Sequence, residues 1–478
     1  MGSIKIQAAL DEVEQLLRDE KNISPALAAA IKVLIAVIPL LMARLGLNSH
    51  NSSKPPSQDP YRARKTDGGS GKARGGQPGR AGTTLHPVDD PDAIEIIHID
   101  KRSLPRNAYQ VAGFERRQVI DIRIERYVTE YRAEILVNVQ GKRFVAPFPQ
   151  GVTRPVQYGA SVKAQAVYLS MFQLIPYARI ETHFEELYAL PISAGSLVNF
   201  NQEACERLDT FVALAKLQLP RLQVMHADET GVNVDGKLRW LHTASGEHWT
   251  LFSVHEKRGR EAMDEIGVLP AFTGTLVHDH WKPYYLYPCV HALCNAHHLR
   301  ELTYAHETEG QAWALEMKTL LLKVNAAVEA AGGCLDAPVA SVWRRRYRRL
   351  LKKAEEECPP PDKPPSGKRG RLKRSKSRNL LERLRDYEAD VLRFMDNSAV
   401  PFTNNQGERD IRMTKVQQKI SGCFRSPEGA ETFCRIRSYL STCRKHNVGV
   451  GEALERLFRG VWPDFIQELL KDSGECGE

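Results

Sequence analysis

The sequence has few cysteines, and they are not arranged in pairs. Nine cysteines are scattered over 478 residues, an odd number, and no two of them form a CxxC motif. This distribution argues against a disulfide framework and against a cysteine-rich zinc module. It suits a protein of the reducing cytosol.

Long apolar runs are also missing. The longest uncharged apolar run near the N-terminus, residues 33–43, has eleven residues and contains Pro39, which is too short to cross a bilayer. The N-terminal residues do not show the pattern of a signal peptide. Hydrophobic residues make up 42% and charged residues 26% of the chain, as in an ordinary soluble protein with room for about two to four domains. We therefore expect a cytoplasmic protein without a membrane partner.

Positive charge is in excess, and it is concentrated in one segment. The net charge is +9, yet residues 344–385 alone hold 17 Lys and Arg against 5 Asp and Glu, a balance of +12 that leaves −3 for the rest. A basic segment on a near-neutral protein indicates binding to a polyanion, most often nucleic acid. The alternative is a solvated basic loop.

The N-terminal part divides into three predicted segments. Residues 1–47 are expected to be helical, and Pro39 should kink or split the helix. Residues 48–84 are rich in Gly, Ser, Pro, Lys and Arg and predict a flexible basic linker. Residues 85–150 alternate in polarity, as in IEIIHI and RAEILVNV, and predict a small β-rich module.

The helical segment carries a heptad-like seam. Apolar residues recur alternately four and three positions apart at Leu27, Ile31, Leu34, Ile38, Leu41 and Leu45. This spacing predicts a coiled coil or a short helical hairpin that self-associates. Packing of the seam against the same chain is the alternative.

Residues 151–218 show helical periodicity. The stretch 178–188 predicts one helix, ALPIS a short turn, and Ser193 the N-cap of the next helix. Two helices around a tight turn fit a helix-turn-helix, which can place its second helix in the DNA major groove. A plain packing unit is the alternative.

Two acidic residues occupy positions in predicted strands where buried apolar residues are expected. In HADETGVNVDGKLRW, Asp228 follows an apolar run, and an Asp-Gly pair before renewed alternation predicts a β-hairpin with this acid near the middle of its first strand. A later strand, GTLVHDHW, carries Asp279 in the same setting. Two such carboxylates on neighbouring strands repel each other unless a cation lies between them, and magnesium suits oxygen ligands. The alternative for each is a turn cap or an arginine pair.

A third acid, Glu408, lies in TNNQGERDIRMTK, where a helix is expected to start at Asn404 or Asn405. A glutamate beside cations on a helix suits a metal ligand next to a phosphate backbone. The spacing from Asn405 to Glu408 is also that of a capping box, which is the alternative. Three cations follow at helical spacing on or near the face of Glu408: Arg412, Lys415 and Lys419.

With these motifs the chain resembles the DDE-type transposases of the insertion-sequence-66 family of bacterial mobile elements, over nearly its whole length. The motifs that carry the resemblance are LNSHNSSKPPS, GGQPGRAG, HADETGVNVDGKLRWLH, LVHDHWKPY, HALCNAHHLREL, TNNQGERDIRMTKVQQKISGCFRS and IRSYLSTCRKH. The resemblance implies a multidomain α/β (α+β) protein with an RNase H-like catalytic core, a coiled-coil N-terminus and a helix-turn-helix. It also implies that Asp228, Asp279 and Glu408 form the catalytic and metal-binding triad.

We expect this core to comprise residues 219–302 and 398–425, with a helical basic insertion at 303–397 between them and a C-terminal helical region at 426–478. The middle of the insertion, PPPDKPPSGKRGRLKRSKSR, is too rich in Pro, Gly and charge to pack. The basic residues expected on DNA are Arg409, Arg412, Lys415, Lys419, Arg344, Arg345, Arg346, Arg348, Arg349, Lys368, Arg369, Arg371, Lys373 and Arg374.

The resemblance further implies an enzyme that binds the terminal inverted repeats of an insertion sequence, cleaves DNA and joins the 3′-hydroxyl ends to target DNA. The triad would hold two magnesium ions, with manganese as a substitute, and no covalent enzyme intermediate is needed. We expect further copies of the chain and accessory proteins of the same element as partners, at the nucleoid. The alternatives are an idle or domesticated sequence-specific DNA-binding protein, and a metal-dependent nuclease without strand transfer.

No zinc is expected. Relatives often have a CxxCG zinc knuckle after the linker, but the corresponding stretch here offers only His98 and Asp100, a poor ligand set. In HALCNAHHLREL, His291, Cys294 and His297 at three-residue spacing resemble ligands on a helix face. Since no fourth ligand is evident, we expect structural or phosphate-contacting roles there.

Overall fold

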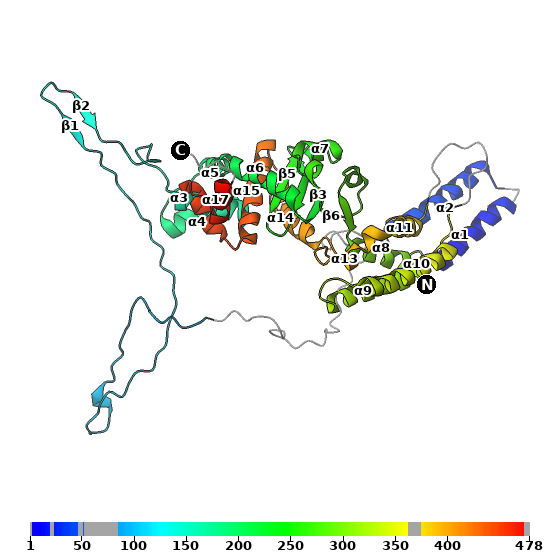
Figure 1. Ribbon diagram of the computed structural model, residues 1–478, viewed down its shortest axis with the longest axis horizontal. Helices are drawn as coiled ribbons and strands as arrows, with labels where there is room; N and C mark the ends of the chain where they lie inside the picture. The colour runs from blue at the N-terminus through cyan, green and yellow to red at the C-terminus, as the bar shows by residue number, and fades with distance from the viewer. Residues whose placement is uncertain (1, 20–22, 46–50, 52–84, 362–373, 473–478) are drawn as a thin grey trace.

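The computed structural model describes residues 2–19, 23–45, 51, 85–361 and 374–472 (Figure 1). The chain combines helices with one five-stranded mixed sheet and one separate β-hairpin. The mixed helix-and-sheet class expected from the sequence is confirmed. No helix in the described part of the chain combines the length and apolarity needed to span a membrane.

The five-stranded sheet has the order β5-β4-β3-β6-β7. Its strands are β3 (Val224–Val234), β4 (Lys237–Ser245), β5 (Thr250–His255), β6 (Thr275–His278) and β7 (Val290–Leu293). Strands β3, β4 and β5 are antiparallel, whereas β6 and β7 run parallel to β3.

The predicted hairpin is confirmed at the β3–β4 turn. Asp235 and Gly236 have φ of 51° and 73°, and this turn geometry is what makes Asp-Gly a hairpin signal.

Helices cover the sheet and share one apolar core with it. These are α3 (Ala160–Val167), α4 (Tyr177–Tyr188), α5 (Ala194–Glu206), α6 (Asp209–Gln218), α7 (Arg260–Ile266), α15 (Pro427–Lys445), α16 (Val450–Arg459) and α17 (Asp464–Asp472). The core brings Met225 and Leu276 of the sheet against Phe211, Tyr439 and Leu454 of the helices. The segment 151–218 is therefore packed with the sheet. Helix α14 (Asn405–Ser421) packs on the sheet through a separate apolar cluster, in which Ile411 joins Val232 and Phe252.

The helix pair inside that segment follows the sequence prediction. Helix α4 covers the predicted stretch, and the Ser193 hydroxyl caps α5 by accepting a hydrogen bond from the backbone N–H of Ser196 at 3.2 Å. Short helical turns complete this part of the chain: η3 (Tyr168–Phe172), η4 (Leu219–Arg221), η5 (Leu269–Ala271) and η6 (Lys282–Leu286).

A second apolar core lies in the helices between β7 and α14. They are α8 (Asn295–Glu307), α9 (Ala312–Ala330), α10 (Ala337–Glu357), α11 (Lys376–Asp386), α12 (Glu388–Val391) and α13 (Arg393–Asp396). Trp313 and Tyr347 are fully buried there. The predicted insertion is thus helical, although α8 begins before it.

The expectation that residues 359–378 do not pack is wrong at their C-terminal end. Arg378 is 4% exposed in α11 and forms ion pairs with Glu355 and Glu382. Composition alone missed this, because the Arg378 charge finds one partner on α10 and another within α11 itself. Residues 362–373 lie outside the described residues.

The segment 85–150 contains less strand than its alternation predicts. It holds the hairpin of β1 (Ile135–Val137) and β2 (Arg143–Val145) and the turn η2 (Lys101–Ser103), on an extended excursion from the helices and sheet (Figure 1). Residues 94–99, read as a strand, are not one. Their isoleucines are exposed, so the alternation has neither a neighbouring strand nor a core to pack against.

At the N-terminus, α1 (Gly2–Asp19) and α2 (Pro25–Leu45) are both helical. Helix α2 continues through Pro39, so of the expected kink or split, the split does not occur. Seam residues Leu27, Leu34 and Leu41 are 53–56% exposed, and the described part of the chain leaves them largely uncovered. The predicted linker 48–84, apart from Asn51, lies outside the described residues.

Candidate active site

Asp228 and Asp279 lie next to each other on adjacent parallel strands. Asp228 is near the middle of β3, as predicted, and Asp279 directly follows β6. The register pairs His226 with Val277, two residues before each acid. Both side chains are partly buried, and among the described residues neither forms an ion pair with Lys or Arg. The arginine-pair alternative therefore does not hold for either acid.

Short backbone contacts orient both carboxylates. The Oδ1 atom of Asp228 accepts a hydrogen bond from the N–H of Glu229 at 2.9 Å. That of Asp279 accepts one from the N–H of Trp281 at 3.0 Å, as a turn cap would. Each carboxylate thus keeps a second oxygen for another ligand.

The electrostatics of this pair are unfavourable without a cation. Burial, followed by the charges of Glu229 and Asp279, raises the pKa of Asp228 to about 8, and Glu408 adds to the effect. Near neutral pH the carboxyl must therefore hold a proton or lie against a positive charge.

A fourth acid, Glu229, belongs to the same cluster of negative charges. The sequence did not identify it as a candidate site residue. Its side chain is 2% exposed and accepts hydrogen bonds from the Tyr284 hydroxyl at 2.5 Å and from Arg258 at 2.6 Å. The Arg258 guanidinium lies over the rings of Trp240 and Trp281, 4.7 and 4.3 Å from their centroids. Burial raises the pKa of Glu229, although Tyr284 and Arg258 oppose this. In the sequence, only the position of Glu229 next to Asp228 pointed to a place in this site.

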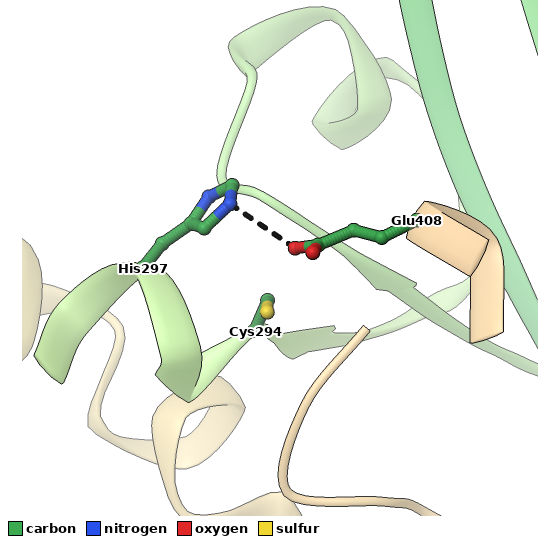
Figure 2. A group of neighbouring side chains, drawn as sticks. All are labelled: Cys294, His297 and Glu408. Carbon is green, nitrogen blue, oxygen red and sulfur yellow. Dashed lines mark ion pairs between the residues drawn. The ribbon is translucent and has the colours of Figure 1, made fainter. Parts of the chain in front are cut away.

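Glu408 comes from the first turn of α14, which packs against β3 and β4. Its Oε1 atom is 3.3 Å from Nε2 of His297 on α8, outside hydrogen-bond geometry, and has no other donor among the described residues. The His297 imidazole lowers the pKa of Glu408. Figure 2 shows the ring and the carboxylate facing each other with the Cys294 thiol beside them.

The capping-box alternative for Glu408 does not fit this geometry. The helix starts at Asn405, as predicted, and its N-cap is Asn404. The backbone N–H of Asn404 donates to the Sγ atom of Cys294 at 3.1 Å, not to Glu408. With Asn404 as the N-cap, a capping box would need its glutamate at the position of Gly407, so Glu408 lies one residue too far along for that role.

Asn404 instead fixes the start of α14 against β3. Its side chain makes hydrogen bonds with the His226 ring at 2.7 Å and with the carbonyl of Ala227 at 3.0 Å. Gly407 allows this close approach, because a Cβ there would lie 3.0 Å from the Asn404 Oδ1 atom. Both strand residues directly precede Asp228, so one side chain links the helix of Glu408 to the strand of Asp228.

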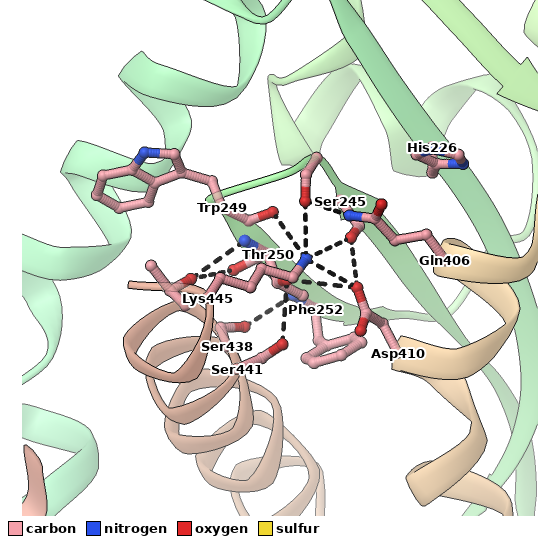
Figure 3. Close-up of polar contacts among 12 residues, drawn as sticks. His226, Ser245, Trp249, Thr250, Phe252, Gln406, Asp410, Ser438, Ser441 and Lys445 are labelled. Carbon is pink, nitrogen blue, oxygen red and sulfur yellow. Dashed lines mark hydrogen bonds and ion pairs between the residues drawn. The ribbon is translucent and has the colours of Figure 1, made fainter. Parts of the chain in front are cut away.

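A buried lysine anchors the same helix from its other side (Figure 3). Lys445, at the end of α15, donates to Asp410 of α14 at 2.9 Å and to the Thr250 hydroxyl at 2.6 Å. It also reaches the Ser245 hydroxyl and the carbonyl of Gly246, both at 2.9 Å. We refer to these contacts as the Lys445 network. It ties α14, α15 and the β4–β5 connection together.

The cations predicted on the helix of Glu408 are exposed: Arg409, Arg412, Lys415 and Lys419. The Lys415 amine donates to the carbonyl of Gly231 at 3.1 Å. Partial burial lowers its pKa, while the nearby charge of Asp228 opposes this. Arg412 helps to lower the pKa of Glu408. Positive charge from this helix therefore lies near Asp228 and Glu408.

The basic residues of the insertion fall into two groups. Arg344 pairs with Asp396, Arg348 with Glu388 at 2.9 Å, and Arg374 with Glu382. By contrast, Arg345, Arg346 and Arg349 are exposed on α10, and none has an ion-pair partner in the described ranges. The remaining predicted DNA contacts, Lys368, Arg369, Arg371 and Lys373, lie outside the described residues.

His291 does not belong with Cys294 and His297. It is on strand β7 and contacts His278 at 3.1 Å, because α8 begins only at Asn295. The three residues therefore do not share one helix face, although their spacing resembles that of ligands on a helix. Cys294 and His297 instead share a site with Glu408, where their ligand atoms all lie within 4.8 Å of one another.

Comparisons with known proteins agree with the resemblance seen in the sequence. The model of the Transposase IS66 family matches residues 155–432, more than half of the chain, a range within which all three acids lie. A family of unknown function (DUF6444) matches residues 3–86. No curated protein matches the chain.

Proposed function

Because the chain belongs to the IS66 transposase family, we propose that it binds the ends of an insertion sequence, cleaves DNA there and joins the 3′-hydroxyl ends to target DNA. Family membership makes it a DNA-transposing enzyme. The proposal adds the reaction path, two-metal phosphoryl transfer, and the residues Asp228, Asp279 and Glu408 that carry it.

The proposed catalytic core is RNase H-like. Support comes from the strand order β5-β4-β3-β6-β7, in which three antiparallel strands are followed by two that run parallel to the first. Helix α14 lies against β3, so the third acid approaches the first strand from a separate element.

One observation carries the proposal: two acids on adjacent strands form no ion pair with Lys or Arg among the described residues, and the pKa of Asp228 is raised to about 8. A divalent cation between them would remove the repulsion that causes part of this shift. Magnesium fits this all-oxygen donor set, together with water and substrate phosphate. Asp228, Asp279 and Glu408 would hold it.

When bound, magnesium supplies Lewis-acid activation of the attacking oxygen and stabilisation of the leaving oxygen. Asp228 and Asp279 hold their positions on the rigid strands, and Glu408 is oriented by the contacts of Asn404 and the Lys445 network at the start of α14. Lys415 and Arg412, on the same helix, would bind the phosphates that flank the reacting bond. No side chain is needed as a covalent nucleophile.

Outside the catalytic core, we propose that α10 tracks the DNA backbone. Arg345, Arg349 and Lys352 follow one another four and three residues apart, so they lie on one helix face. All three are exposed, and none has an ion-pair partner in the described part of the chain. We name these three residues the α10 stripe. Arg344 and Arg348, which are engaged with Asp396 and Glu388, are the paired arginines.

A pair of matched variants tests the proposal. Asp279→Asn should abolish nicking and joining of DNA that carries the element's ends, while DNA binding remains. Asp235→Asn is the control, because Asp235 lies in the β3–β4 turn with φ of 51°, a conformation that asparagine tolerates. Activity should require magnesium or manganese and fail with calcium, whose looser coordination misplaces the reacting oxygens.

The assay also separates the alternatives. Nicking without joining would favour a metal-dependent nuclease, and specific binding without either would favour an idle DNA-binding protein. Near-wild-type cleavage by Asp279→Asn would refute the metal assignment. We also propose assembly of several copies on DNA through the exposed seam of α2, and sedimentation of the DNA complex would measure this.

A further inference from the structure

Cys294, His297 and Glu408 form a group of side chains that the proposed DNA chemistry uses only in part. The thiol, the imidazole and the carboxylate come from the start of α8 and the start of α14, about 110 residues apart in the chain. Their ligand atoms all lie within 4.8 Å of one another. We propose that these three residues form a zinc site, distinct in its donor set from the all-carboxylate magnesium site.

The donor set is the first argument. Magnesium avoids sulfur, whereas zinc binds Cys, His and carboxylate ligands together and accepts three protein ligands with water in the fourth position. Cys294 is buried, while the side chains of His297 and Glu408 are 21% and 31% exposed. The open side of the group can therefore admit both the ion and a water molecule.

The distances are the second argument. Tetrahedral zinc with bonds of about 2.0–2.1 Å to nitrogen and oxygen requires these two atoms to lie about 3.3 Å apart. The Nε2 atom of His297 and the Oε1 atom of Glu408 are 3.3 Å apart. Sulfur should lie about 3.6 Å from each of them, so the cluster must contract by about 1 Å, within reach of side-chain rotation.

Unsatisfied polar atoms are the third argument. The Oε1 atom of Glu408 is buried without a hydrogen-bond donor among the described residues. The Cys294 sulfur accepts a hydrogen bond from the backbone N–H of Asn404 at 3.1 Å and is also contacted by the backbone N–H groups of Ala296 and His297, but it has no side-chain partner among the described residues and can still bind a metal. Figure 2 shows all three groups directed toward a common space.

Cobalt(II) is a suitable probe, because its thiolate complexes absorb in the near ultraviolet and zinc displaces it. The full-length protein without DNA or magnesium should bind cobalt with a thiolate band that zinc abolishes. Cys294→Ser should remove the band, and Cys289→Ser should retain it, since Cys289 is also buried but lies outside the cluster. His297→Gln should weaken zinc binding by more than about tenfold, as even outer-shell changes at metal sites do.

The two ligand variants keep the test decisive even if one of them does not fold. If Cys294→Ser does not fold, His297→Gln decides, because the partly exposed His297 side chain forms no hydrogen bond and pairs with no charged group other than Glu408 among the described residues. Absence of a band in the wild type, an unchanged band in folded Cys294→Ser, or an unchanged zinc affinity in folded His297→Gln would overturn the proposal.

The consequence for catalysis rests on the proposed function. Zinc bound here would draw Glu408 away from the magnesium set, so zinc should inhibit magnesium-dependent nicking of wild type and Cys289→Ser equally. An inactive enzyme with an intact cobalt band would count against the proposed function alone. An active enzyme without the band would count against the zinc site alone.

Discussion

Replacing Asp228 by asparagine should stabilise the metal-free protein at alkaline pH. The pKa of this carboxyl is raised from 3.8 to about 8 in the folded protein, about four units at 1.36 kcal/mol each, a ceiling of about 6 kcal/mol. Because the side chain is partly exposed, solvent screening reduces the expected gain to about 2–4 kcal/mol.

The sign of the pH dependence follows from proton binding. Between about pH 4 and about pH 8 the folded state keeps a proton on Asp228 that the unfolded chain has released. Stability is therefore lost as the pH rises through this window, and above it the cost is complete. Asparagine cannot ionise, so the difference in stability between Asp228→Asn and wild type should grow from near zero at about pH 4 to its maximum above pH 8.

Urea denaturation with a chelator present, at about pH 5 and about pH 8.5, measures the effect. Asp235→Asn serves as control, since Asp235 lies in an exposed turn of the same hairpin. Magnesium should then stabilise the wild type, by about 2.7 kcal/mol at a hundredfold excess over Kd, and Asp228→Asn much less. Parallel pH profiles for wild type and Asp228→Asn would refute the account of this site.

Three further changes test other parts of the molecule. Glu408→Gln should leave the protein folded and DNA-binding but lower nicking by at least about a hundredfold, since outer-shell metal partners alone are worth 10–100-fold; retained cleavage would return Glu408 to a structural role. Lys445→Met should lower the free energy of unfolding by about 3–5 kcal/mol, because it leaves the Asp410 charge buried and unpaired. The double variant Lys445→Met, Asp410→Leu should recover part of this loss in the same urea denaturation assay. Neutralising the three residues of the α10 stripe should flatten the slope of log K for DNA binding against log salt by about 2.7. Neutralising the two paired arginines should change this slope by clearly less than two phosphate contacts would. Equal effects per residue would mean that an ion pair within the protein does not keep an arginine from binding DNA.

The sequence could predict those features that depend on neighbours along the chain. The Asp-Gly turn, the Ser193 cap and the start of α14 were all correct. Each rests on backbone conformations and hydrogen bonds within a few residues. The same local reading failed for residues 94–99, since alternation makes a strand only where another strand or a core is available.

The candidate site was predictable in part for the same reason. Asp228 and Asp279 stand out because an acid in an apolar strand breaks the local pattern. Glu229 was overlooked beside Asp228, although Arg258 and Tyr284 make it part of the same charge cluster. Those partners lie 29 and 55 residues away, and no periodicity connects them to it.

The sequence by itself thus determined the kinds of elements, the unusual acids and the amount of positive charge. Only the tertiary structure decided which charges are neutralised within the protein and which remain for a ligand. It pairs Arg344 and Arg348 but leaves Arg349 exposed, and it turns Cys294 and His297 toward Glu408 while His291 contacts His278. The physical reason is that Coulomb forces and ligand geometry act over a few ångströms of space, and folding brings residues more than 100 positions apart within that range.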